Sequence, residues 1–181
     1  MKGVVFTEFL EMVEDTFSPE TADEMITSAE LETDGAYTSA GTYDHQEMVK
    51  MLVELSRLTG LDIGTLLVKY GEHLFTRFVQ GFPAFFENVP TSFDLLKTVD
   101  NYIHIEVRKL YPDAELPKFE HHQPSDSQLI MTYSSPRGLA QFARGLINGC
   151  VAHFDEQVQI EEEDLSGGAG KHVTFTLTRI G

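Results

Sequence analysis

The spacing of the apolar residues changes once along this 181-residue chain, near Pro117. Before Pro117 the apolar residues recur every three or four positions, as they do on one side of a helix. After it, the stretches QLIMTYS and KHVTFTLTRI alternate apolar and polar residues, as strands with one buried face do. Helices followed by strands predict an α+β fold, with an N-terminal helical subdomain and then a C-terminal antiparallel sheet with helices. No repeat or linker divides the chain, so we expect a single domain over 1–181.

Capping residues set the expected helix boundaries. Asp44 suits the start of a helix and Gly60 its end, and the stretch SPETADEM opens another helix with a serine cap followed by proline. Ser92 is expected to cap a long helix that Pro112 ends. We therefore expect helices near 5–17, 45–59, 62–80 and 92–111, together with the helix that SPETADEM opens. The stretch ETDGAYTSAGTYD is expected to be a loop that ends at Asp44.

The last third of the chain is expected to hold four strands and one helix. Two short strands are KFEHHQ and QLIMTYS, and the stretch RGLAQFARGLINGCVAHF is expected to be a helix despite its internal glycines. The segments EQVQIEEEDL and KHVTFTLTRI flank SGGAG and predict a hairpin.

The net charge of −16 argues against nucleic acid and anionic membranes as partners. An acidic surface repels nucleic acid and anionic membranes, so we expect neither as a partner. The N-terminal stretch has early acidic residues and is neither a signal peptide nor a membrane span. A single cysteine, Cys150, cannot form an internal disulfide and is interpreted as a small buried apolar residue. We expect a cytoplasmic protein.

Three stretches that suggest a ligand do not carry one. SGGAGKH lacks the first glycine of a phosphate-binding loop and has histidine where that motif needs serine or threonine, so a hairpin turn explains it better. The run EEED and the pair His121-His122 place neighbouring side chains on opposite faces of a strand, where they do not converge on a metal ion.

The stretch YSSPR places hydrogen-bonding side chains at alternate positions. In an extended chain Tyr133, Ser135 and Arg137 would share one face with the apolar Leu129 and Met131. An apolar face that ends in two hydroxyls and a guanidinium suits an apolar ligand with an anionic edge. Haem is such a ligand, because it is a flat apolar disc with two carboxylates on one edge.

His104 is the histidine that could ligate haem iron. It lies within the expected helix 92–111, with Asp100 and Arg108 four residues away on either side. By itself it is more simply a core or surface histidine of an amphipathic helix. A neutral imidazole on a rigid helix is also an axial haem ligand, and the motif around Arg137 favours this second interpretation.

Taken together, these features resemble the H-NOX family of haem-based nitric oxide and oxygen sensing domains, which includes the haem domain of soluble guanylate cyclase. The chain starts MKGVV, has a histidine in a mid-chain helix, a proline about a dozen residues later and then Y-x-S-x-R. The resemblance implies haem b (iron protoporphyrin IX) buried between the two subdomains and ligated by His104. It also implies that Tyr133, Ser135 and Arg137 clamp the propionates and that Pro117 presses on the macrocycle.

The resemblance also predicts which gas is bound. Family members that hold oxygen have a tyrosine five residues after the motif arginine, and here that position is Phe142. The other residues that match the distal pocket also lack a hydrogen-bond donor: Val5, Phe9, Leu74, Phe78 and Leu146. Since bound dioxygen depends on a donor more than nitric oxide does, we expect nitric oxide selection, with carbon monoxide also bound. Tyr43 and Tyr70 are alternative sources of a hydroxyl.

The expected function is therefore a nitric oxide sensor and not an enzyme. The resemblance implies that it regulates a separate partner, either a sensor histidine kinase or a cyclic-di-GMP synthase or phosphodiesterase. Two alternatives stay open: a haem-dependent oxygenase or peroxidase, for which His73 is the nearest polar candidate, and a haem carrier.

Overall fold

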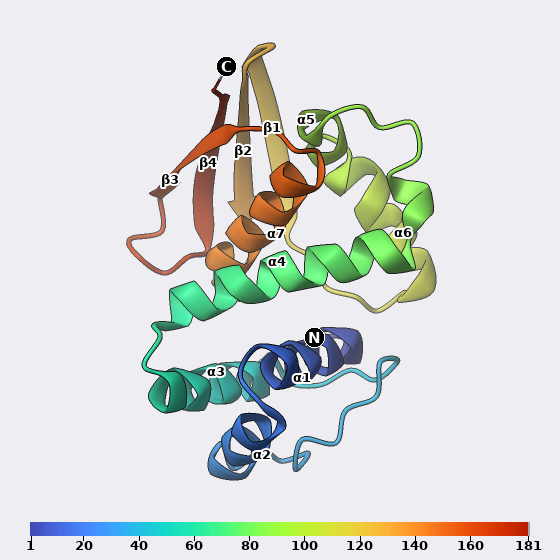
Figure 1. The fold of residues 1–181 in the computed structure, drawn as a ribbon. Coiled ribbons are helices and arrows are strands. Elements are labelled where there is room, and N and C mark those ends of the chain that lie inside the picture. The colour runs from blue at the N-terminus through green and yellow to red at the C-terminus, as the bar shows by residue number, and fades with distance from the viewer. Residues whose placement is uncertain (181) are drawn as a thin grey trace. The chain divides into compact units, whose positions relative to one another are not determined.

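The computed structural model describes residues 1–180 and has an α+β fold (Figure 1). The chain divides into two compact units, Met1–Tyr70 and Gly71–Gly181. Helices and turns lead the chain: α1 (Gly3–Thr16), α2 (Pro19–Ser28), α3 (His45–Thr59), α4 (Ile63–Gly81), the 3-10 turn η1 (Pro83–Phe85), α5 (Ser92–Leu96), the π-helical turn η2 (Val99–Ile103) and α6 (His104–Leu110). The remaining elements are β1 (Lys118–Ser125), β2 (Gln128–Ser134), α7 (Ala140–His153), β3 (Val158–Asp164) and β4 (His172–Arg179).

The predicted caps begin and end the helices of the first unit. The Ser18 hydroxyl accepts a hydrogen bond from Thr21 N at 3.1 Å, and the Asp44 carboxylate accepts one from Gln46 N at 2.9 Å. Gly60 ends α3 with φ of 73°, in the left-handed region that favours glycine. The predictions for these boundaries are confirmed.

Aromatic, leucine and methionine side chains fill the core of the first unit. Each side chain of this kind contributes about 1.5–3 kcal/mol when it is fully buried. The buried set is Phe6, Phe9, Met12, Val13, Met25, Met48, Met51, Leu52, Leu55, Leu66 and Tyr70.

A buried carboxylate anchors the loop between α2 and α3. Glu47 is 5% exposed and accepts hydrogen bonds from Thr33 N at 3.1 Å, the Thr33 hydroxyl at 2.7 Å and the Tyr37 hydroxyl at 2.6 Å. Burial pushes the pKa of Glu47 upward, but these hydrogen bonds outweigh it and hold the pKa below 4.5. The carboxylate therefore stays ionised and keeps the loop in place.

The same loop caps the start of α1. Gly3 N donates to Gly41 O at 2.8 Å, and Val4 N donates to Ser39 O at 3.0 Å. These bonds satisfy two N–H groups that a helix leaves without an internal partner. A Cβ atom at Gly3 would lie 1.8 Å from Thr38 O, so only glycine fits this close approach.

The second unit is built on a four-stranded antiparallel sheet in the order β1-β2-β4-β3. In its register Met131 lies opposite Phe175 and Tyr133 lies opposite Val173, on the face that α7 covers (Figure 1). The hairpin predicted around SGGAG is confirmed as β3–β4. The core beneath α5 and α7 consists mainly of Phe93, Leu95, Leu129, Met131, Tyr133, Ala143, Ile147, Cys150, Val173, Phe175 and Leu177.

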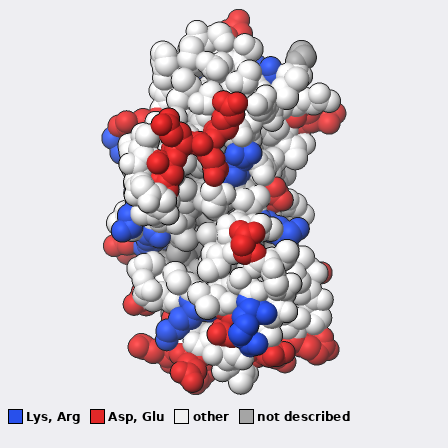
Figure 2. Space-filling model, turned by 90° about the vertical axis from the view of Figure 1, so that its left-hand side faces the viewer, with Lys and Arg blue, Asp and Glu red and all other residues white. Residues whose placement is uncertain are grey.

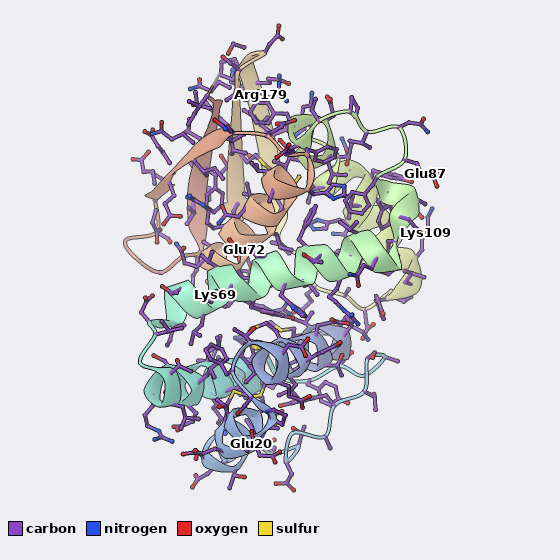
Figure 3. All side chains as sticks on the ribbon, in the orientation of Figure 1. Glu20, Lys69, Glu72, Glu87, Lys109 and Arg179 are labelled. Atoms are coloured by element: carbon purple, nitrogen blue, oxygen red, sulfur yellow. The ribbon has the colours of Figure 1, made fainter. Side chains whose placement is uncertain are left out.

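Glycines let the second half of α4 approach α7 closely. A Cβ atom at Gly71 would lie 2.3 Å from Phe142 O, and one at Gly149 would lie 2.7 Å from Phe75 Cβ. Glu72, labelled in Figure 3, accepts a hydrogen bond from Asn148 Nδ2 at 2.9 Å across the same contact. Gly149 of α7 therefore has a packing role, although glycine by itself disfavours a helix.

The prediction of one long helix over 92–111 is wrong. Thr91, and not Ser92, caps α5 by accepting a hydrogen bond from Asp94 N. The Thr98 hydroxyl donates to Leu95 O at 2.7 Å, and Thr98 O then accepts from Ile103 N at 3.1 Å, five residues later. This pattern widens the backbone into η2 and breaks the helix into three parts.

The chain is acidic in composition, and the face in Figure 2 shows groups of Asp and Glu side chains, with Lys and Arg between them, on a largely uncharged surface. Strand β3 lies at one edge of the sheet and carries Glu161, Glu162 and Glu163. Of these, Glu162 contacts Gln141 and Arg144 of α7. Within residues 1–180, every helix is too short or too polar to cross a bilayer.

Candidate functional site

His104 is the first residue of α6 and directly follows the π-helical turn. Its residue exposure is 8%, and its Nδ1 lies 3.3 Å from Oδ1 of Asp100. Burial lowers the pKa of His104, and the neighbouring Asp100 carboxylate partly opposes that effect. The imidazole is therefore neutral near neutral pH, and with Nδ1 facing Asp100 its Nε2 is the nitrogen suited to coordinate a metal.

Asp100 and Phe119 connect His104 to the sheet. The Asp100 carboxylate also accepts from Phe119 N at 3.3 Å, so one carboxyl group contacts both the η2–α6 segment and β1. The Phe119 ring lies 6.0 Å from the His104 ring and 5.6 Å from the Tyr133 ring, measured between centroids. The sequence pattern indicated Asp100 only as a helical neighbour of His104, and nothing in it pointed to Phe119.

The predicted strand face for Tyr133, Ser135 and Arg137 is wrong in its geometry. Strand β2 ends at Ser134, and the chain then turns through Pro136 and Gly138, whose φ is 68°. A proline lacks the N–H that a ladder needs, so the strand cannot continue through position 136.

The turn nevertheless brings the three side chains together. Tyr133 is buried, and its hydroxyl accepts a hydrogen bond from Leu139 N at 3.2 Å. Burial raises the pKa of Tyr133, while a hydrogen bond with the Ser135 hydroxyl and the positive charge of Arg137 act in the opposite direction. Ser135 also accepts from Arg137 N at 3.3 Å. The motif thus forms a compact set of hydroxyl and guanidinium donors.

The guanidinium of Arg137 already holds a carboxylate. It forms an ion pair with the Glu115 carboxylate and donates from Nη1 to Glu115 O at 2.8 Å. The Glu115 side chain is 82% exposed, whereas that of Arg137 is 16% exposed. Pro117 lies two residues later, half-buried, at the end of the segment that leads into β1.

Four of the predicted distal residues lie on two touching helices of the second unit. Leu74 and Phe78 come from α4, and Phe142 and Leu146 come from α7. The close approach at Gly71 brings these helices together at Phe142 and Leu146. Phe78, Phe142 and Leu146 are only half-buried although they are apolar, and none of them carries a hydrogen-bond donor on its side chain.

The remaining two predicted distal residues, Val5 and Phe9, lie on α1. The Tyr70 hydroxyl donates to Val5 O at 2.5 Å, and the Tyr70 ring packs edge-on against Phe9 at 5.2 Å between centroids. The Tyr43 hydroxyl accepts from Thr38 N at 2.8 Å, in the loop that caps α1. Both tyrosines that were alternatives for a distal donor therefore make hydrogen bonds within the first unit.

The chain was compared with curated proteins, with protein families and with solved structures. No curated protein sequence matches the chain. The family described as haem-NO-binding matches residues 2–162. The chain belongs to this family, the H-NOX proteins. H-NOX proteins are haem-based gas-binding sensor domains, so the family predicted from the sequence is confirmed.

Solved H-NOX structures resemble this one over nearly the whole chain. The Fe(II) unliganded H-NOX protein from K. algicida is 40% identical, with 100% of this chain and 97% of that chain covered and a TM-score of 0.94. The H-NOX from Shewanella woodyi in the Fe(II)CO ligation state is also 40% identical, with coverage of 99% and 95% and a TM-score of 0.84. The S. oneidensis protein in the Fe(II)NO ligation state shares the fold at 24% identity, with full coverage of both chains and a TM-score of 0.91.

The residues present fit the haem group that H-NOX proteins bind. A buried neutral imidazole suits iron, and the pairing of Arg137 with Glu115 shows that this guanidinium accepts a carboxylate such as a propionate. The Tyr133 and Ser135 hydroxyls beside it are suited to a second hydrogen bond to the same group.

Proposed function

We propose that this H-NOX domain is a nitric oxide sensor that uses haem b. The observation that carries the proposal is the apolar character of the residues matched to the distal side, above all Phe142. The hydrogen bond from the Tyr70 hydroxyl to Val5 O supports it. A carbonyl oxygen can only accept, so the single phenol proton of Tyr70 is used in this bond. That proton is therefore not available as a donor to a bound gas.

The proposed roles follow the sequence motifs. His104 ligates the iron, Tyr133, Ser135 and Arg137 hold the propionates, and Pro117 presses on the macrocycle. The residues proposed for the distal side, by their match to distal positions of the family, are Val5, Phe9, Leu74, Phe78, Phe142 and Leu146. When bound, ferrous haem would supply an iron atom that can take a diatomic gas, with His104 as the protein ligand.

Polarity explains the expected gas preference. Dioxygen gains more negative charge than nitric oxide when it is bound, and an apolar environment leaves that charge without a donor. Nitric oxide and carbon monoxide depend less on a hydrogen-bond donor when they are bound. A similar H-NOX structure in the Fe(II)CO state and an H-NOX structure of the same fold in the Fe(II)NO state support the choice of these gases.

The signal is proposed to start at His104. His104 directly follows a π-helical turn, where helical hydrogen bonding is irregular, so a movement of its imidazole would disturb few regular backbone bonds. Movement of α6 would then report to a separate signalling protein, a sensor histidine kinase or a cyclic-di-GMP synthase or phosphodiesterase. The domain itself is proposed to have no catalytic role.

Absorption spectroscopy of the purified ferrous protein tests the proposal. The expected spectrum in air equals that of the deoxygenated protein, while nitric oxide and carbon monoxide each change it. A stable, distinct spectrum in air would overturn nitric oxide selection and favour an oxygen-using haem enzyme. Rapid transfer of haem to apomyoglobin would favour a haem carrier.

The His104→Ala variant tests the ligand assignment. It should bind haem only when imidazole is added, because the variant lacks the imidazole that would ligate the iron and free imidazole can replace it. Full haem occupancy with an unchanged ferrous spectrum would assign the iron to another histidine, with His73 the next candidate.

A further inference from the structure

The Tyr70 hydroxyl is hydrogen-bonded to the part of α1 that carries Val5 and Phe9. Helical geometry pairs Val5 O with the N–H of the residue four positions later, which is Phe9. The Tyr70 hydroxyl donates to the same carbonyl, and its ring packs edge-on against the Phe9 ring. One buried side chain therefore contacts both residues of α1 that match the distal face.

The chemistry of this contact makes it persistent. Tyr70 is 1% exposed, and burial raises the pKa of its phenol well above 10, with the charge of Glu8 acting in the same direction. The phenol therefore keeps its proton across the physiological pH range and remains a donor. The loop anchored by Glu47 holds the first N–H groups of the same helix, so α1 is held at its start and one turn further on.

We propose that Tyr70 is a positioning residue that fixes Val5 and Phe9 and thereby sets how fast a gas ligand leaves the distal side. The inference rests on the proposed function, since it takes these two residues to line the distal face. The hydroxyl acts through α1 and does not touch the ligand. Loss of a hydrogen bond of this kind corresponds to about a fivefold change in a rate that depends on it.

Tyr70→Phe and Tyr37→Phe form a matched pair for the test. Each removes one hydroxyl of the first unit and keeps the ring, but the Tyr37 hydroxyl donates to Glu47 and not to α1. The measurements are the rate of carbon monoxide dissociation from the ferrous full-length protein, the width of the infrared C–O band, and hydrogen exchange of the Phe9 amide.

Tyr70→Phe is expected to change the dissociation rate about fivefold, broaden the C–O band and speed exchange at Phe9. Tyr37→Phe should leave all three unchanged, because Thr33 N and the Thr33 hydroxyl still hold Glu47 and with it the loop at the start of α1, although the melting temperature falls. Equal behaviour of Tyr70→Phe and wild type, or an equal effect of both variants, would overturn the inference. A wild-type protein that takes up no haem would instead overturn the proposed function, and the exchange of the Phe9 amide would still test the hold on α1.

Discussion

Asp100 Oδ1 lies 3.3 Å from His104 Nδ1, one helical turn before it, and the same oxygen accepts a hydrogen bond from Phe119 N. The carboxylate thus fixes the orientation of the imidazole ring relative to β1. A partner of this kind raises the basicity of a ligating imidazole and fixes its tautomer.

Asp100→Asn should weaken the bond between His104 and iron while haem remains bound. The neutral amide is a poorer acceptor for the Nδ1–H group, and losses of this kind cost about tenfold in metal affinity. The iron–histidine stretching band in the resonance Raman spectrum should move to lower frequency. An unmoved band would mean that Asp100 does not control the ligand.

Arg137→Ala should speed haem loss more than Ser135→Ala does. A hydrogen bond to a charged group contributes about 1.5–3 kcal/mol, which corresponds to roughly a 10- to 150-fold faster transfer of haem to apomyoglobin. Glu115→Gln is the control, because it removes the charge that competes for the guanidinium. Transfer from that variant should be no faster than from wild type, and equal rates for all four proteins would place the clamp elsewhere.

Phe142→Tyr should allow some oxygen binding, since it adds a hydroxyl on α7 at the position where oxygen-holding relatives carry tyrosine. The spectrum of the ferrous variant in air should then differ from its deoxygenated spectrum. Phe142→Leu keeps the position apolar and should behave as wild type. If both variants form the same oxygen complex, the size of the side chain and not its hydroxyl decides the outcome.

Glu47→Gln should destabilise the chain by about 2 kcal/mol at neutral pH, because Thr33 and Tyr37 lose a charged acceptor. The folded-state pKa of Glu47 is lowered, so its contribution is present above 4.5 and is lost as the pH falls through the lowered value. Urea unfolding of both proteins should therefore show a difference at neutral pH that shrinks below pH 4.5. A difference that does not vary with pH would contradict an ionised Glu47.

Gly149→Ala should lower the stability by a net amount of about 1 kcal/mol. The new methyl group would meet the Phe75 side chain, at a cost that exceeds the gain in helix propensity. Gly81→Ala at the end of α4 meets no atom within 4 Å and should be neutral or stabilising. Thermal unfolding of the two variants compares a packed glycine with an open one.

Local signals were sufficient to predict most of the fold. Asp44 and Gly60 act on groups within a few residues, and the alternation in β2 and β4 directly reflects one buried face. The break between α5 and α6 was missed because it depends on the Thr98 hydroxyl bond to Leu95 O, which leaves the apolar spacing of the segment unchanged.

The backbone geometry of the candidate site was not predicted from the sequence. The alternation in YSSPR suggested a strand, whereas Pro136 ends the strand and a turn gathers the donors. The contacts of Arg137 with Glu115 and of Tyr70 with Val5 join residues 22 and 65 positions apart, and no local pattern encodes such pairs.

The two outer strands of the sheet bear on how copies of this protein behave toward one another. An exposed strand edge invites pairing with a second chain, and natural sheets discourage it with charge, proline or a bulge. Here β3 carries consecutive carboxylates, and β1 has Pro124 together with an irregular register between His122 and Ser125. Concentrated solutions should therefore stay free of fibrous aggregates at neutral pH, and mild acidification should remove the protection at β3 before that at β1.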